Sequence, residues 1–181
     1  SGARGSFSEE AGFLYIEKNK LQDKVDFDYL LDMENVLSAL EKGEIDLGIF
    51  PVANLHGGLV RMAFDAMGRH LFCVHDELWL NVRQCLLANP AIMIEDITTI
   101  ASHPQGLLQC REYLQKKFPH AKILEWIDTA QSAKDLSRGH ASLESSRSAV
   151  IAPKASAKYY GLDVLAENIQ DRQPNLTAFI I

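Results

Sequence analysis

The first third of the chain places apolar residues at helical spacing and then in short extended runs. A helix is predicted over 32–43, where Gly43 stands at the expected C-terminal end and the apolar positions are Met33, Val36, Leu37 and Leu40. A buried strand closed by Pro51 is predicted over 45–52, and a loop over 54–58 follows it. Together with a helix that begins near Ser6 or Ser8, this order predicts a parallel α/β sheet whose first strand would precede residue 1.

The same alternation of strand and helix restarts in the second half of the chain. Residues 71–88 are expected to form long strands, with Val74, Leu78, Leu80 and Val82 in the core. Further strands are predicted at 98–101, 121–126, 149–152 and 177–181, and helices at 106–118, from 128 onward, and at 154–160. The prediction is therefore a two-lobed α/β protein in which each lobe is a mixed or parallel sheet flanked by helices. Lobe 1 is formed by 1–72 and 166–181, and lobe 2 by 73–165.

Composition and charge narrow the functional classes. The 181 residues are 47% apolar and carry a net charge of −6, which disfavours a nucleic-acid partner held by massed cations. No run of eighteen apolar residues and no signal-like N-terminus is present, so no membrane association is predicted. Three cysteines with no metal-ligand spacing favour a reducing, cytoplasmic setting.

Four stretches place small polar residues where a helix is predicted to begin or a strand to end. They are 5–8, Asn54 with 57–58, 102–105 and 129–132. Helix N-termini offer free N–H groups, so several of them together could bind a carboxylate or phosphate without bulk positive charge. The alternative is that each is an ordinary helix cap.

Other chemical motifs are absent. The sequence has no dinucleotide fingerprint, P-loop, HxxxH zinc spacing or GxSxG elbow. Cys110 is expected to be a buried structural thiol, and Trp79 and Trp126 are expected in the core.

Six motifs, in order, resemble the prephenate dehydratase domain over essentially the whole chain. Residues 2–11 are similar to the family pattern GPxGTFSEEA, and 41–54 to ExGExDxGVVPIEN. Residues 102–110 are similar to SHPQALAQC, 128–133 to STAxA, 160–171 to YGLxVLAxNIQD, and 175–179 to NxTRF.

The resemblance implies a two-lobed fold like that of type II periplasmic binding proteins, with the dianion prephenate bound in the cleft. The family removes water and carbon dioxide from prephenate to give phenylpyruvate, on the route to phenylalanine, with no metal or organic cofactor. It implies that Thr177 is catalytic, through a hydrogen bond to the leaving oxygen. The implied substrate-binding residues are Ser6, Asn54, Ser102, Gln105, Thr129 and Ala130, the last through its backbone N–H.

Three positions depart from the family motifs. Ala178 stands in place of the motif arginine, and Ala53 and Leu55 in place of a glutamate and a serine. Loss of an arginine that paired with a substrate carboxylate would forfeit about 1.5–3 kcal/mol. Two alternatives therefore stay open: a non-aromatising prephenate decarboxylase, whose relatives also lack this glutamate and arginine, and a prephenate-binding or regulatory module without activity.

The resemblance also bears on assembly. The regulatory ACT domain that usually follows in the family has no counterpart in these 181 residues, so feedback by phenylalanine is not predicted from them. A homodimer, or a place in a longer fusion chain, is expected by resemblance.

Overall fold

The computed structural model describes residues 1–181, which divide into two compact units. Unit 1 comprises Ser1–Ala3, Phe7–Val82 and Asn175–Ile181, and unit 2 comprises Arg4–Ser6 and Arg83–Pro174. The boundaries between the units lie after Val82 and before Asn175, whereas the boundaries between the predicted lobes lie at 72/73 and 165/166. Residues 77–81 stay with unit 1 because they pair with the C-terminal strand.

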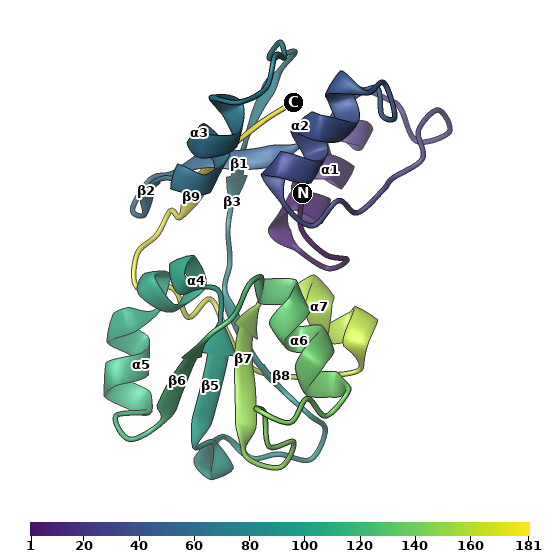
Figure 1. The fold of residues 1–181 in the computed structure, drawn as a ribbon. Helices are drawn as coiled ribbons and strands as arrows, with labels where there is room; N and C mark the ends of the chain where they lie inside the picture. The colour runs from purple at the N-terminus through teal and green to yellow at the C-terminus, as the bar shows by residue number, and fades with distance from the viewer. The chain divides into compact units, whose positions relative to one another are not determined.

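Unit 1 contains one antiparallel sheet. Its elements are α1 (Phe7–Lys18), α2 (Met33–Glu41), β1 (Phe50–Asn54), β2 (Gly58–Leu59), α3 (Arg61–Met67), β3 (Glu77–Asn81) and β9 (Leu176–Ile180). The strand order is β2-β1-β9-β3, and every neighbouring pair is antiparallel. Figure 1 shows the yellow C-terminal strand β9 beside the blue β1.

The helix-flanked sheet expected for the first third of the chain is present, but its strands pair antiparallel rather than parallel. The predicted strand over 45–52 begins only at Phe50, and residues 45–49 are extended but unpaired. One of the two inner strands, β9, comes from the far end of the chain and lies between β1 and β3. A pattern that is local in sequence carries no information about such a long-range pairing.

Apolar residues cover both faces of this sheet. On one face Leu78, Leu80 and Phe179 pack against Ala11 and Tyr15 of α1. On the other face Phe50 packs with α2 and α3 through Val36, Leu37, Ala63 and Ala66. Val74 and Trp79 were predicted in the core but are 54% and 52% exposed. Val74 lies outside any strand, and Trp79 alternates with the buried Leu78 and Leu80, which places it on the opposite face.

Unit 2 contains a five-stranded sheet in the order β6-β5-β7-β4-β8. Its elements are β4 (Cys85–Ala88), η1 (Ile94–Asp96), β5 (Thr99–Ser102), α4 (Pro104–Gln109), α5 (Arg111–Lys117), β6 (Lys122–Glu125), α6 (Thr129–Ser137), β7 (Ser148–Ala152), α7 (Lys154–Tyr160) and β8 (Asp163–Glu167). β6, β5 and β7 run parallel, while β4 is antiparallel to β7 and β8.

Helices cover both faces of the unit 2 sheet. Ala133 and Leu136 of α6 and Ala157 of α7 pack in one cluster, and Cys110 and Leu114 pack in the other (Figure 1). The helix predicted over 106–118 begins at Pro104 and is broken at Cys110, whose φ of −114° and ψ of 18° are not helical. Cys110 is buried, and burial raises the pKa of its thiol, as expected for a structural cysteine.

Residues 168–171 join the end of β8 to the rest of unit 2. The Ile169 N–H donates to the Gln84 carbonyl, and the Gln84 N–H donates to Gln170 Oε1. The Asp171 carboxylate accepts from the N–H groups of Glu112 and Tyr113 and so caps α5. This motif therefore has a structural role that its own contacts explain.

No helix of the chain has both the length and the apolar content to cross a membrane.

Candidate functional site

Thr177 lies in the middle of the unit 1 sheet. Its neighbours across the two ladders are Asn54 on β1 and Leu80 on β3. Thr177 is 7% exposed and Asn54 6% exposed, and the Asn54 Nδ2 donates to Thr177 Oγ1 at 2.9 Å. The predicted catalytic threonine and one predicted binding residue are therefore in direct contact, and both are held by strand pairing.

The Asn54 side chain is fully engaged within the protein. Its Oδ1 accepts from the N–H groups of His56, at 3.0 Å, and Gly57, at 2.7 Å. Because backbone N–H groups can only donate, these two bonds fix which end of the amide faces Thr177. The Nδ2 also donates to Asn175 Oδ1 at 2.8 Å and to the Leu176 carbonyl at 3.2 Å.

The fixed amide determines the direction of the hydrogen bond at Thr177. Nδ2 cannot accept, so Thr177 Oγ1 must be the acceptor in this bond. No protein group of the structure accepts the hydroxyl proton of Thr177. The hydroxyl hydrogen of Thr177 is therefore available as a hydrogen-bond donor.

Asn175 and Asn81 extend the hydrogen-bond network around Asn54. Asn175 is 1% exposed, its N–H donates to Asn81 Oδ1 at 3.0 Å, and its carbonyl accepts from the Val82 N–H at 2.8 Å. The sequence analysis did not single out Asn81. The local sequence shows only a polar residue between the apolar Leu80 and Val82.

The three positions that depart from the family motifs also lie in unit 1. Ala53 and Ala178 are direct partners across the β1–β9 ladder, on the face opposite Thr177. A glutamate at 53 and an arginine at 178 would therefore meet each other as a cross-strand pair. Because both are alanine here, neither leaves an unpaired charge. Leu55 is 55% exposed, and its N–H donates to the Leu176 carbonyl at 2.8 Å.

In unit 2, Ser102 and Thr129 meet at the carboxyl end of β5. Ser102 is fully buried, and its Oγ donates to the Ile151 carbonyl of β7 at 2.6 Å. A Cβ at Gly106 would lie 2.7 Å from Ser102 Oγ and 3.4 Å from Thr129 Cγ2. Only glycine fits there, and its absence of a side chain lets α4 begin directly against Ser102 and Thr129.

Gln105 and Ala130 lie in the first turns of α4 and α6. The Gln105 N–H donates to His103 Nδ1 at 3.2 Å, while Gln105 Oε1 is buried with no hydrogen-bond partner. Asp128 caps α6 by accepting from the Gln131 N–H at 2.8 Å. Burial raises the pKa of Asp128, and hydrogen bonds from the backbone of Gln131 and Ala130 oppose that rise. The Ala130 N–H thus already faces a carboxyl group of the protein.

Ser6 lies in the segment Arg4–Ser6, which belongs to unit 2, whereas Asn54 and Thr177 belong to unit 1. Ser6 is 3% exposed, and the neighbouring Gly5 carbonyl accepts from Ser156 Oγ of α7 at 2.9 Å. Gly5 has a φ of +83°, and a Cβ there would lie 3.0 Å from Ser156 Oγ, so glycine is required on both counts. Tyr160 donates to the Arg4 carbonyl at 2.6 Å.

Both units thus present small polar side chains and backbone N–H groups, with no cluster of three or more His, Cys, Asp or Glu side chains suited to a metal ion. Groups of this kind can bind a small anionic ligand through hydrogen bonds. A sequence model of the family "Prephenate dehydratase" matches residues 1–181, and the chain belongs to that family.

Individual relatives agree with the family match. "Arogenate dehydratase 2" of Petunia hybrida is 32% identical over 180 residues, which cover 99% of this chain and 43% of that protein. A "Bifunctional chorismate mutase/prephenate dehydratase" of Buchnera aphidicola is 29% identical, over 99% of this chain and 45% of that protein. The chain therefore spans less than half the length of these relatives.

A solved structure shares the fold. The prephenate dehydratase of Arthrobacter aurescens, determined in complex with L-Phe, superposes with a TM-score of 0.81 at 26% identity. The match covers 99% of this chain and 57% of that one. The mixed α/β architecture with two helix-flanked sheets is thus that of the family.

Proposed function

We propose that this chain binds prephenate and converts it to phenylpyruvate, carbon dioxide and water. The family match over the full chain supports this activity. The observation that carries the proposal is the hydroxyl of Thr177, which Asn54 holds as a hydrogen-bond donor in a buried strand position. Such a group is what a departing ring hydroxyl requires.

In the proposed reaction the ring carboxylate leaves as carbon dioxide, and the electron pair of the broken C–C bond enters the ring. The ring C–O bond breaks, and the ring becomes aromatic. Thr177 donates a hydrogen bond to the leaving hydroxyl, which takes up one proton and departs as water. Any proton that Thr177 gives up is replaced from solvent, so the residue ends each turnover neutral.

Asn54 then acts as a positioning residue, because its own polar atoms are all bonded to protein groups. Ser6, Ser102, Gln105, Thr129 and Ala130 are proposed as substrate-binding residues on the strength of the motifs that contain them. Among them, Gln105 Oε1 is buried without a hydrogen-bond partner in the protein.

Product analysis tests the activity. The protein is incubated with prephenate, and phenylpyruvate is measured against the rate of spontaneous acid-catalysed conversion. Because several relatives bear the name arogenate dehydratase, arogenate is offered in parallel. Phenylalanine formed faster than phenylpyruvate would move the preferred substrate to arogenate, and neither product above background would refute the proposed function.

Variants then test the roles of Thr177 and Asn54. Thr177→Ala should lower kcat by roughly 100-fold or more, and Thr177→Ser should restore part of that loss because it keeps the hydroxyl. Asn54→Asp replaces the donor with an acceptor, so it should lower kcat with little change in KM. A rise in KM at constant kcat would instead make Asn54 a substrate ligand.

A non-aromatising decarboxylase is the second candidate. The paired absence of the motif glutamate and arginine at Ala53 and Ala178 favours it. That reaction releases carbon dioxide but keeps the hydroxyl, and NMR distinguishes its non-aromatic hydroxy-keto acid from phenylpyruvate. Binding of prephenate in calorimetry without either product would favour the binding module. A cytoplasmic location and a homodimer remain part of the proposal.

A further inference from the structure

Asn81 lies at the point where the β3–β9 ladder ends. Its partner in the register is Leu176, and the next two residues, Val82 and Asn175, stand at the boundaries of unit 1 along the chain. The Val82 N–H donates to the Asn175 carbonyl at 2.8 Å, whereas the Asn175 N–H donates to a side chain, Asn81 Oδ1, at 3.0 Å. The Asn81 amide therefore holds the main chain of Asn175 immediately before β9 begins.

The same bond fixes the orientation of the Asn81 amide. A backbone N–H can only donate, so the atom of Asn81 that faces Asn175 must be the amide oxygen. Asn81 is exposed and lies at the end of a strand in which buried and exposed residues alternate. Its side chain thus contributes an acceptor to the fold rather than buried surface.

Asn175 passes this constraint on to Asn54. The Asn175 Oδ1 accepts from Asn54 Nδ2 at 2.8 Å, and the two residues are only 1% and 6% exposed. An amide nitrogen carries two hydrogens, and Asn175 takes one of them. The other serves Thr177 Oγ1 at 2.9 Å, with the Leu176 carbonyl farther away at 3.2 Å. The position of Asn175 therefore helps to direct the Asn54 amide toward Thr177.

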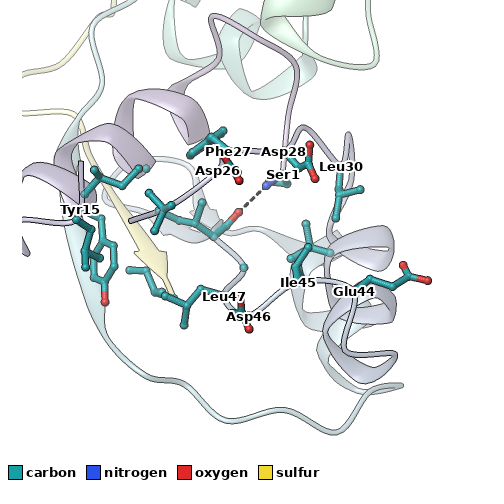
Figure 2. A pocket seen from close by; sticks show the side chains of 18 of the residues that line it. Ser1, Tyr15, Asp26, Phe27, Asp28, Leu30, Glu44, Ile45, Asp46 and Leu47 are labelled. Carbon is teal, nitrogen blue, oxygen red and sulfur yellow. Dashed lines mark hydrogen bonds between the residues drawn. The ribbon is translucent and has the colours of Figure 1, made fainter. Parts of the chain in front are cut away.

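A path of three hydrogen bonds thus joins Asn81 to Thr177. It runs from Asn81 Oδ1 to the Asn175 main chain, from Asn175 Oδ1 to Asn54 Nδ2, and from Asn54 Nδ2 to Thr177 Oγ1. All four residues belong to unit 1. The hollow of unit 1 is lined by other residues (Figure 2), so a substitution at Asn81 leaves its walls unchanged.

We propose that Asn81 is a positioning residue for the Thr177 hydroxyl, acting through Asn175 and Asn54 without touching the substrate. The inference rests on the reaction proposed above, in which Thr177 donates to the leaving hydroxyl. Small displacements of a reacting group change the rate steeply, so an acceptor outside the site can govern kcat. Loss of the Asn81 acceptor frees the Asn175 main chain, loosens the Asn54 amide and widens the range of directions in which Thr177 donates.

Two substitutions separate the acceptor of Asn81 from its size. Asn81→Leu is of similar size but cannot accept a hydrogen bond, whereas Asn81→Asp keeps an oxygen for the Asn175 N–H. The matched control is Asn89→Leu, because Asn89 also follows a strand and its side chain bonds to a main-chain group, the Ser145 carbonyl, at 3.1 Å. Both kcat and KM are measured with prephenate and with arogenate. Hydrogen exchange of the Asn54 side-chain amide and of the Asn175 N–H is followed by NMR.

Asn81→Leu should lower kcat by roughly tenfold with KM changed by less than about twofold, and it should speed hydrogen exchange at both Asn175 and Asn54. Asn81→Asp should recover most of the lost kcat, and Asn89→Leu should leave kcat unchanged. In a Thr177→Ala background, Asn81→Leu should lower kcat no further, because the hydroxyl that Asn81 positions is gone.

Three results would overturn the proposal. Faster exchange at Asn175 alone, with kcat unchanged, would make Asn81 only the end of a ladder. A raised KM at constant kcat would make it a substrate ligand, and the same loss of kcat in the Thr177→Ala background would make its effect a general one. A parent protein that converts neither substrate would refute the proposed function, whereas the link from Asn81 to Asn54 would still stand or fall with exchange at the Asn54 amide.

Discussion

Unit 1 and unit 2 differ in how completely their apolar side chains and strands are covered. Thirteen of the eighteen large apolar residues that are exposed belong to unit 1. Nine of the twelve largest fully buried side chains belong to unit 2, where all five residues of β7 are buried. Unit 2 thus covers its apolar side chains more completely than unit 1, whose paired strands are β1, β9 and β3 with the short β2.

This difference indicates where rigidity is available for function. Thr177 sits on β9, one of the two inner strands of the unit 1 sheet, where two ladders and the Asn54 network determine its position. Ser102 sits at the end of a central parallel strand of unit 2 and is fixed by Ile151. Both predicted site regions therefore lie on the paired centre of a sheet, as precise positioning requires.

The largest expected effect comes from the core of unit 2. Leu136 on α6 is fully buried, so Leu136→Ala should lower the free energy of unfolding by about 2–5 kcal/mol. Leu47→Ala removes the same atoms from a side chain of unit 1 and should cost less than about 0.5 kcal/mol, because Leu47 is 45% exposed. Urea denaturation measures the free energy of unfolding of both variants. Similar losses of that free energy would show that Leu136 and Leu47 are equally well packed.

A smaller effect is expected where α4 approaches β5. Gly106→Ala places a Cβ 2.7 Å from Ser102 Oγ, which is itself held by Ile151, and should destabilise by about 1–3 kcal/mol. Combining it with Ser102→Ala should cost less than the sum of the two single changes, because the clash is relieved. Gly68→Ala is the matched change in unit 1. Its φ is −71° and its nearest contact is 3.5 Å, so it should be neutral or slightly stabilising.

The ladder position of Ala53 and Ala178 predicts a coupling between two substitutions. Ala178→Arg alone should destabilise, because Ala178 is 6% exposed and the new charge would lack a partner. Adding Ala53→Glu should recover about 0.5–1 kcal/mol relative to additive behaviour. A double-mutant cycle by thermal unfolding measures this term. Additivity would mean that the motif arginine and glutamate do not pair, and the loss of a substrate contact would then explain Ala178.

Local rules predict much of the fold from the sequence. The apolar spacing of 33–40 predicts α2, which Asp32 caps and Gly43 follows with a φ of +69°. Gly161, with a φ of +66°, ends α7 as predicted. Strands such as 148–152 are recognisable because a parallel strand buried on both faces is a continuous apolar run.

The errors arise where the answer depends on distant residues. The position of β9 between β1 and β3 is set by partners more than ninety positions away, so the local sequence pattern does not predict its antiparallel pairing. The same pattern does not predict the exposure of Trp79. Thr177 and Asn54 were found through family motifs, but only the structure shows the bond between them. Asn81 carried no motif, because its role is to bond to the Asn175 N–H, which lies far along the chain.

The smallest prediction concerns two histidines, one in each unit, with opposite pH dependence. In unit 1 the carboxylates of Glu41 and Glu34 contact His70 at 2.7 and 2.8 Å and raise its pKa. His70 should therefore stabilise the fold below its unfolded pKa of about 6.5, and this stabilisation should be lost as pH rises through the higher folded value. In unit 2 burial lowers the pKa of His103, so protonation below about pH 6.5 should oppose folding. The thermal midpoint is measured at about pH 5.5 and 8.5 for the parent, His70→Gln and His103→Gln. His70→Gln should lower the thermal midpoint more at the lower pH than at the higher pH. His103→Gln should lower it less at the lower pH than at the higher pH. The same pH dependence in both variants would contradict the contrast, because paired carboxylates at His70 and burial at His103 shift the proton equilibrium in opposite directions.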